Sequence, residues 1–252
     1  MGIVETIKKG FGVAFKSLDL VFTLFTFGLV WSGANLYYSK QVGPDAAANP
    51  SPMTALLGGL FLLTSIFMQS GSLAYVRDKI KTGAASLATF TASGFKYYLR
   101  LLGLGLLIAL AAGIVLAIAG LLMRFLATAG LVIAVILGAV GIYFILLVFL
   151  APYVIVADEG KVFKSISQSV VIVRKNILAV LGVVALLVLI GLGIGLLLGL
   201  AISLLSLAVK GTASQIVMAV LSSLVNAFLG TIVSGTFMSF YFSRGSNNTT
   251  GA

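Results

Sequence analysis

Cysteine and histidine are both absent from this chain of 252 residues, and acidic side chains number only six. Their absence excludes thiol nucleophiles, disulfide bonds, histidine general bases and zinc sites of the usual kind. Charged residues make up 9% of the sequence and hydrophobic residues 60%, with a mean hydropathy of +1.20. Soluble domains carry about 25% charged residues. So few charges cannot cover a water-facing surface, which excludes a soluble globular enzyme.

Long apolar runs are what the sequence has instead. A bilayer core about 30 Å thick needs roughly 20 apolar residues in a helix. Six runs meet this requirement, at residues 20–38, 53–76, 101–123, 125–153, 177–209 and 213–242. They are continuously apolar, whereas the strands of membrane barrels alternate between apolar and polar residues. The sequence therefore predicts an all-α, polytopic membrane protein with six transmembrane helices, forming a single domain over residues 1–245 with a disordered tail at 246–252.

Basic residues divide unevenly between the two sides of these six spans. With the N-terminus inside, thirteen Lys and Arg residues fall on the cytoplasmic side, against Lys40, Arg124 and Lys210 on the other. The positive-inside rule then predicts that both termini are cytoplasmic. The net charge of +10 indicates loops that face an anionic membrane surface. We expect anionic lipids as partners and no nucleic acid.

Charged, amphipathic stretches precede the first, third and fifth spans. They cover residues 3–18, 84–99 and 161–177, and their apolar residues recur at helical spacing. Such helices lie in the membrane interface. Shifts of 80 and then 79 residues superpose Lys16, Lys96 and Lys175. This period predicts three units of an interfacial helix plus a hairpin, at about 1–80, 81–159 and 160–243. The alternative is coincidence, because interfacial helices commonly end in Lys.

The basic side chains of these stretches are candidate contacts for lipid headgroups. They are Lys16, Lys96, Arg100, Lys164, Arg174 and Lys175. Asp158 and Glu159 precede the third stretch, where acids suit the positive end of a helix dipole. We expect Asp158 to cap that helix, and we favour this role over an active acidic pair.

Small residues recur at every fourth position in several spans. The candidate packing positions are Gly105, Gly113, Gly191, Gly195, Gly199 and Gly230. In lipid, small faces let helix backbones approach closely. This pattern predicts packing within the chain, with a homo-oligomer contact as the alternative. The sixth span carries one such face, made of Ser222, Asn226, Gly230 and Ser234.

Polar side chains at membrane depth are few, and the largest are Asn35, Gln69 and Asn226. We expect them to form hydrogen bonds between helices, and the alternative is that they line a small polar cavity. No acid or base falls near the middle of a span. Ion-coupled carriers usually need such a buried charge, so a proton-driven carrier is disfavoured. The sequence also contains no nucleotide-binding, metalloprotease or serine hydrolase motif. We therefore expect no enzymatic activity, no metal and no cofactor.

One segment resembles a known group of proteins. In residues 151–176 (APYVIVADEGKVFKSISQSVVIVRKN), the residues that carry the resemblance are Pro152, Glu159, Gly160, Ser165, Ser169 and Lys175. The segment is similar to a loose superfamily of six-span prokaryotic integral membrane proteins, which includes the membrane domain of glycerophosphodiester phosphodiesterases. Ser165-Ile166 and Val170 match that pattern only in part. The resemblance implies a prokaryotic inner-membrane location and does not transfer the phosphodiesterase activity.

Two functions follow from these observations. The favoured one is a non-enzymatic scaffold or accessory subunit that organises lipid or a partner membrane complex. The alternative is a small permease or channel with a path between the three helical hairpins, lined by the amides of Asn35, Gln69 and Asn226. An intramembrane lipid enzyme is disfavoured because neither a paired acid nor an activated serine is present.

Overall fold

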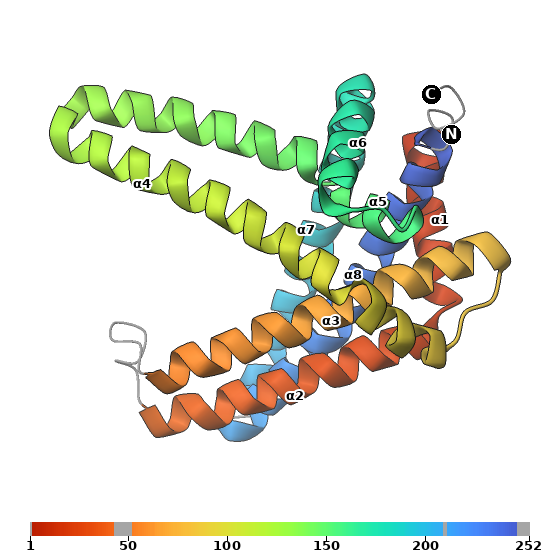
Figure 1. Cartoon of the computed structure of the whole chain (residues 1–252). Helices are drawn as coiled ribbons and strands as arrows, with labels where there is room; N and C mark the ends of the chain where they lie inside the picture. Colours follow the sequence, from red (N-terminus) through yellow and green to blue (C-terminus); the bar gives the residue numbers. More distant parts are fainter. Residues whose placement is uncertain (1, 43–51, 209–210, 246–252) are drawn as a thin grey trace.

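The computed structural model describes residues 2–42, 52–208 and 211–245, and the regular structure in these ranges is entirely helical (Figure 1). Eight helices follow one another along the described chain. They are α1 (Ile3–Phe15), α2 (Leu18–Val42), α3 (Pro52–Thr82), α4 (Leu87–Val148), α5 (Ala151–Ala157), α6 (Val162–Lys175), α7 (Ile177–Ala208) and α8 (Thr212–Arg244). The tail predicted at 246–252 lies outside the described residues.

Six helical segments are long and apolar enough to cross a membrane. They are Leu18–Tyr38, Pro52–Thr82, Leu87–Phe125, Ala129–Ala157, Ile177–Leu204 and Thr212–Arg244. This confirms the predicted all-α architecture with six membrane-crossing segments. The start of α1 and the end of α8 lie close together at one end of the molecule (Figure 1), as an even number of crossings requires. Their assignment to the cytoplasm stays a prediction from the charge distribution.

Two of the six segments belong to α4, which folds back on itself as a long hairpin (Figure 1). Gly130 makes the fold-back feasible. A Cβ atom at this position would collide with the backbone oxygen of Leu122 on the other arm. Because only glycine lacks this atom, the two arms can come into backbone contact just beyond the turn.

Two of the three predicted interfacial stretches are separate helices, namely α1 and α6. The stretch at 84–99 differs. Its helix begins at Leu87, after Ser86 accepts a 3.2 Å hydrogen bond from the Thr89 backbone N–H, and runs without a break into the third span. The elements follow the order of three hairpins, each preceded by an amphipathic segment. An internal repeat in the evolutionary sense stays a prediction.

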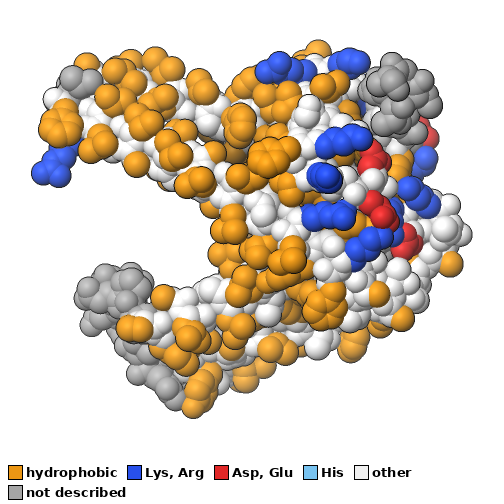
Figure 2. Space-filling model, viewed as in Figure 1, with side chains coloured by type: hydrophobic (Ala, Val, Ile, Leu, Met, Phe, Trp, Pro, Cys, Tyr) orange, Lys and Arg blue, Asp and Glu red, His pale blue; other side chains and the backbone are white. Residues whose placement is uncertain are grey.

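The packed core lies at the end of the molecule that carries the termini. Ser70–Val76 of α3 are buried there, as are most of α5 and the last turns of α8. The hairpins leave many large apolar side chains exposed, as lipid-facing segments do. Figure 2 shows hydrophobic side chains over the extended hairpins and most of the visible charged side chains over the core end, with one basic group at the tip of the α4 hairpin.

The glycines that bring helices together are not the predicted ones. At Gly105, Gly113, Gly191, Gly195, Gly199 and Gly230, an added Cβ atom would meet no atom within 4 Å. The prediction that they pack within the chain is wrong, because the α4 hairpin extends away from α2 and α3 (Figure 1) and the other four positions face open space. A contact between copies of the chain is not tested. The close approach is instead at Gly10 of α1 and Gly235 of α8, where a Gly235 Cβ would lie 3.2 Å from the Gly10 Cα.

Candidate functional site

A cavity of about 800 Å³ lies between α2, α3 and α8, and we call it the α2–α3–α8 cavity. Asn35, Gln69 and Asn226 all line it. These three residues are up to 191 positions apart in the sequence, yet they line one cavity. This is the alternative that the sequence analysis gave for the three amides. A smaller cavity of about 420 Å³ lies between α2 and α8 and shares Ser32, Asn35 and Ser222 with the first.

Close contact between α2 and α8 forms one wall of the α2–α3–α8 cavity. A Cβ atom added at Gly28 would lie 3.2 Å from the Cβ of Ser223, so the missing side chain lets the two helices touch. The hydroxyl oxygens of Ser32 and Ser223 are 3.3 Å apart and form a hydrogen bond. This junction fixes the depth at which the polar face of α8 meets α2.

Aromatic side chains join α2 to α3 across the cavity. The ring of Phe61 lies 5.2 Å from that of Trp31, edge to face, and 6.2 Å from that of Phe27, stacked. Toward the end away from the core, the hydroxyls of Tyr38 and Thr54 are 2.8 Å apart. The lining extends along α3 from Thr54 to Ser72, a rise of about 27 Å at 1.5 Å per residue. It therefore covers most of a bilayer core about 30 Å thick.

The chemistry of the lining is polar, aromatic and uncharged. The hydroxyl and amide groups come from Ser32, Asn35, Tyr38, Thr54, Ser65, Gln69, Ser72, Tyr153, Ser222, Ser223, Asn226 and Ser234. No Lys, Arg, Asp or Glu is among the described residues that line the cavity. The sequence analysis identified only the three amides as possible lining residues. The face Ser222, Asn226, Gly230 and Ser234 was expected to pack helices, but it forms the α8 wall of the cavity, because helical spacing alone does not distinguish the two uses.

The three amides are exposed, and none of them forms a hydrogen bond with another described residue. The expected role as hydrogen-bonding contacts between helices is therefore not what the geometry shows. A polar group that is removed from water without a partner costs several kcal/mol in hydrocarbon. The amides consequently require water or a bound polar molecule in the cavity.

Two buried tyrosines lie between the polar lining of the cavity and the charged end of the molecule. Tyr75, one turn beyond Ser72, donates its hydroxyl to both carboxylate oxygens of Asp19, at 2.7 and 2.6 Å. Tyr241 of α8 donates to a carboxylate oxygen of Asp158 at 2.7 Å. Both rings are buried. These bonds tie α2 to α3, and the α5–α6 connection to α8, directly beneath the polar lining.

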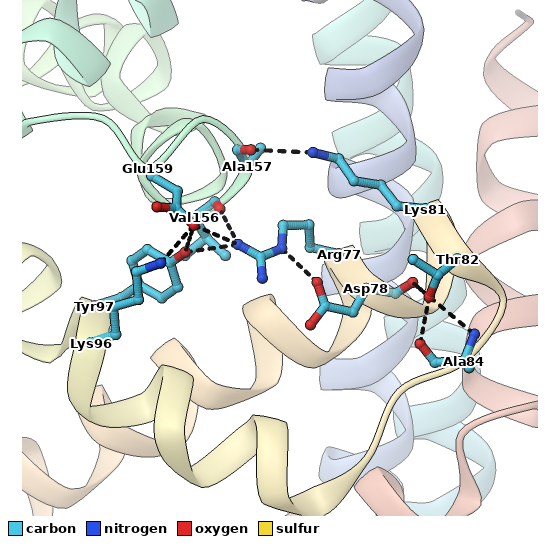
Figure 3. Close-up of polar contacts among 10 residues, drawn as sticks. All are labelled: Arg77, Asp78, Lys81, Thr82, Ala84, Lys96, Tyr97, Val156, Ala157 and Glu159. Carbon is cyan, nitrogen blue, oxygen red and sulfur yellow. Dashed lines mark hydrogen bonds and ion pairs between the residues drawn. The ribbon is translucent and has the colours of Figure 1, made fainter.

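A cluster of charged side chains covers the end of α5 (Figure 3). Arg77 donates to the hydroxyl of Tyr97 at 2.7 Å, to the Val156 carbonyl at 3.0 Å and to Asp78 at 2.8 Å. Lys81 donates to the carbonyl of Ala157 at 3.4 Å. Cations at the last carbonyls of a helix satisfy unpaired acceptors and suit the helix dipole. The cluster thus has a structural role in holding α5 against α3 and α4.

Glu159 has a positive φ of 55°, which is unusual for a residue other than glycine. Three contacts hold it in place: its carboxylate accepts from Lys96 at 2.7 Å and Tyr97 at 2.9 Å, and its carbonyl accepts from Arg100 at 2.7 Å. The sequence predicted that Asp158 caps α6, and this prediction is wrong. Asp158 ends α5, and its carboxylate accepts from Tyr241, while Lys161 occupies the start of α6 without a side-chain cap.

The predicted headgroup contacts fall into two groups. Lys96 and Arg100 bind Glu159, so their charges are partly used within the protein. Lys16, Lys164, Arg174 and Lys175 are exposed. Anionic lipid at these positions stays a prediction.

Acid should weaken the contact between α4 and the α5–α6 connection. Hydrogen bonds from Lys96 and then Tyr97 hold the pKa of Glu159 below its ordinary value. A lowered pKa in the folded state means that ionised Glu159 stabilises the fold at neutral pH, and this contribution is lost as pH falls through that lowered pKa. The effect is small because the side chain is exposed. As the pH is lowered, the melting temperature of Glu159→Gln should fall less steeply than that of the unaltered chain. Equal slopes for the two proteins would contradict this prediction.

Residues 1–243 match a protein family that carries the description "Domain of unknown function (DUF7847)". No curated protein and no solved structure matches the chain.

Proposed function

We propose that this chain, which belongs to the DUF7847 family, is a small permease that moves a polar, hydrogen-bonding cargo along the α2–α3–α8 cavity. One observation carries the proposal. The amides of Asn35, Gln69 and Asn226 line the same cavity and bind no other described residue. Polar groups in this state at membrane depth are typical of a functional path.

The uncharged lining supports a cargo that is not a bare ion. An ion leaves its hydration shell only where full or partial charges replace it, as carbonyl rings or charged side chains do in channels. The described lining offers scattered hydroxyl and amide groups and no charged side chain. It therefore suits a polar group that needs hydrogen bonds but no counter-charge.

The path differs from the one expected from the sequence. Its described lining comes from α2, α3 and α8, with Tyr153 of α5, and includes no residue of α4 or α7. A path between all three hairpins is therefore replaced by one between the first hairpin and the last span. The proposal has three further parts. They are the likeness to the membrane domain of glycerophosphodiester phosphodiesterases, the prokaryotic inner-membrane location and the absence of enzymatic activity.

A scaffold or accessory role is the second candidate. The exposed cations Lys16, Lys164 and Arg174 support it, because each basic residue near an anionic surface contributes about 1 kcal/mol of attraction. Retention of anionic lipid or of a partner membrane protein after gentle extraction would support this role. A chain that purifies alone, in a zwitterionic lipid shell, would contradict it.

Cysteine labelling tests whether the cavity contains water. Because the chain has no cysteine, any label must lie on the cysteine that is introduced. We expect Asn35→Cys and Asn226→Cys to react with a membrane-impermeant thiosulfonate reagent, because a thiol must ionise in water to become nucleophilic. The measurement is the fraction labelled in intact proteoliposomes, read by mass spectrometry.

Val188→Cys is the matched control. Val188 is exposed in the middle of the α7 span and is not part of the cavity, so its thiol should face hydrocarbon and stay unlabelled. Equal reactivity at all three positions, or none at Asn35→Cys and Asn226→Cys, would remove the proposed path.

A further inference from the structure

The α2–α3–α8 cavity is exposed at more than one depth. Asn35 lies toward the end away from the core, and Gln69 lies next to the buried segment that begins at Ser70; both side chains are exposed. Phe61, between these two levels, is 46% exposed. The lining is accessible at all three depths, and the described residues of α4 and α7 add no wall to it. This arrangement indicates a groove along α2, α3 and α8.

Space for a substituent exists along this groove. Gly58 of α3 and Gly230 of α8 both belong to the lining, and an added Cβ at either would meet no atom within 4 Å. The arms of the α4 hairpin extend away from α2 and α3 (Figure 1) and contribute no residue to the described lining. In a bilayer, the molecules that lie against such an open side are lipids.

Polar groups recur at short steps along the groove. On α8, Ser222, Asn226 and Ser234 line the groove at intervals of four and eight residues, which is about 6 and 12 Å of rise. The exposed amides of Asn35 on α2 and Gln69 on α3 add further polar groups. The amide N–H and hydroxyl O–H groups donate hydrogen bonds, and their oxygens accept them. A zwitterionic or phosphate-bearing headgroup can therefore exchange one set of hydrogen bonds for the next as it moves along the groove.

We propose that the cargo of this groove is the headgroup of a phospholipid, which crosses between leaflets along α2, α3 and α8 while its acyl chains stay in the bilayer. The inference rests on the proposed permease function and names its substrate class. The exposed Lys16, two residues before the start of α2, favours the arrival of a phosphate at the charged end. No covalent step is involved, and the direction of net movement follows the lipid gradient.

Lipid scrambling in proteoliposomes tests this proposal. The purified full chain is placed in phosphatidylcholine vesicles that contain a trace of phospholipid with a nitrobenzoxadiazole dye on its headgroup. Dithionite is then added to bleach the dye in the outer leaflet. We expect the signal to fall well below the level left in protein-free vesicles, because inner-leaflet lipid moves outward.

Gly230→Leu provides the critical variant, because it fills the groove without a backbone collision. We expect it to slow bleaching of the inner-leaflet dye roughly tenfold, an increase of about 1.4 kcal/mol in the barrier. Gly120→Leu, in the α4 hairpin and equally free of neighbours, is the matched control and should keep the normal rate. Asn226→Leu gives a second test that removes a polar group and adds little volume.

The outcomes separate this inference from the proposed function. Labelling of Asn35→Cys and Asn226→Cys, together with bleaching that stops at the protein-free level, would overturn the lipid cargo and leave a hydrated path for a soluble solute. Scrambling that is unchanged in both Gly230→Leu and Asn226→Leu would also overturn it, because lipid would then be crossing elsewhere. An absence of labelling in the cysteine variants would remove the proposed function itself.

Discussion

Replacing Gly10 with leucine is expected to unfold the junction between α1 and α8. A Cβ atom at Gly10 would collide with the Thr236 hydroxyl, and it would lie 2.7 Å from the carbonyl oxygen of Ile232 and 2.9 Å from the Thr236 backbone nitrogen. Two of these three atoms belong to backbone, which cannot move aside as a flexible side chain can. Overpacking typically costs about 1–3 kcal/mol, and a backbone collision should place this variant at or above the upper end of that range.

Gly12→Leu serves as the control for this prediction. Gly12 lies two residues further along the same helix, and an added Cβ there would meet nothing within 4 Å. Both variants lose the same glycine flexibility and gain the same side chain. Thermal unfolding in detergent, followed by size-exclusion chromatography, should show a large loss for Gly10→Leu and little change for Gly12→Leu. Similar melting temperatures for the two variants would show that α1 does not pack on α8 in this way.

Replacing Arg77 with methionine should have the second large effect on stability. The guanidinium joins α3 to α4 through Tyr97 and to α5 through the Val156 carbonyl, and it also lies 3.8 Å from Glu159. The side chain is only 14% exposed. Water therefore has little room to replace the hydrogen bonds that its partners would lose. Hydrogen bonds to charged groups contribute about 1.5–3 kcal/mol each. We expect a loss of about 2–4 kcal/mol, since part of the site is open to solvent.

Lys79→Met tests whether this effect belongs to the contacts or to the loss of one charge. Lys79 lies in the last turn of the same helix, in the same charged region, and the replacement side chain is identical. Chemical denaturation in mixed micelles should give a clearly lower free energy of unfolding for Arg77→Met than for Lys79→Met. Arg77→Lys should fall between them, because an ammonium group keeps the charge but not the forked geometry that reaches several acceptors at once. Equal losses for Arg77→Met and Lys79→Met would refute a specific role for the Arg77 contacts.

The membrane class and the number of crossings were determined by the sequence alone. The length of a membrane helix is set by bilayer thickness, and the need to satisfy backbone hydrogen bonds in lipid leaves helices as the simplest solution. Both are local properties, so continuous runs such as 53–76 and 213–242 are sufficient evidence. Basic residues mark the boundary between hydrocarbon and water for a similar local reason.

The tertiary structure decided which small and polar residues meet. Gly195 and Gly235 look alike as small positions on apolar helices, yet only Gly235 lies against another backbone. Asn226 and Ser222 have the spacing of a packing face, yet they line a cavity. The physical reason is that lipid is as apolar as the spans themselves, so hydrophobicity does not specify a neighbour for each helix face. The choice between contact, cavity and lipid depends on side-chain fit between helices distant in sequence, and only their arrangement in space reveals it.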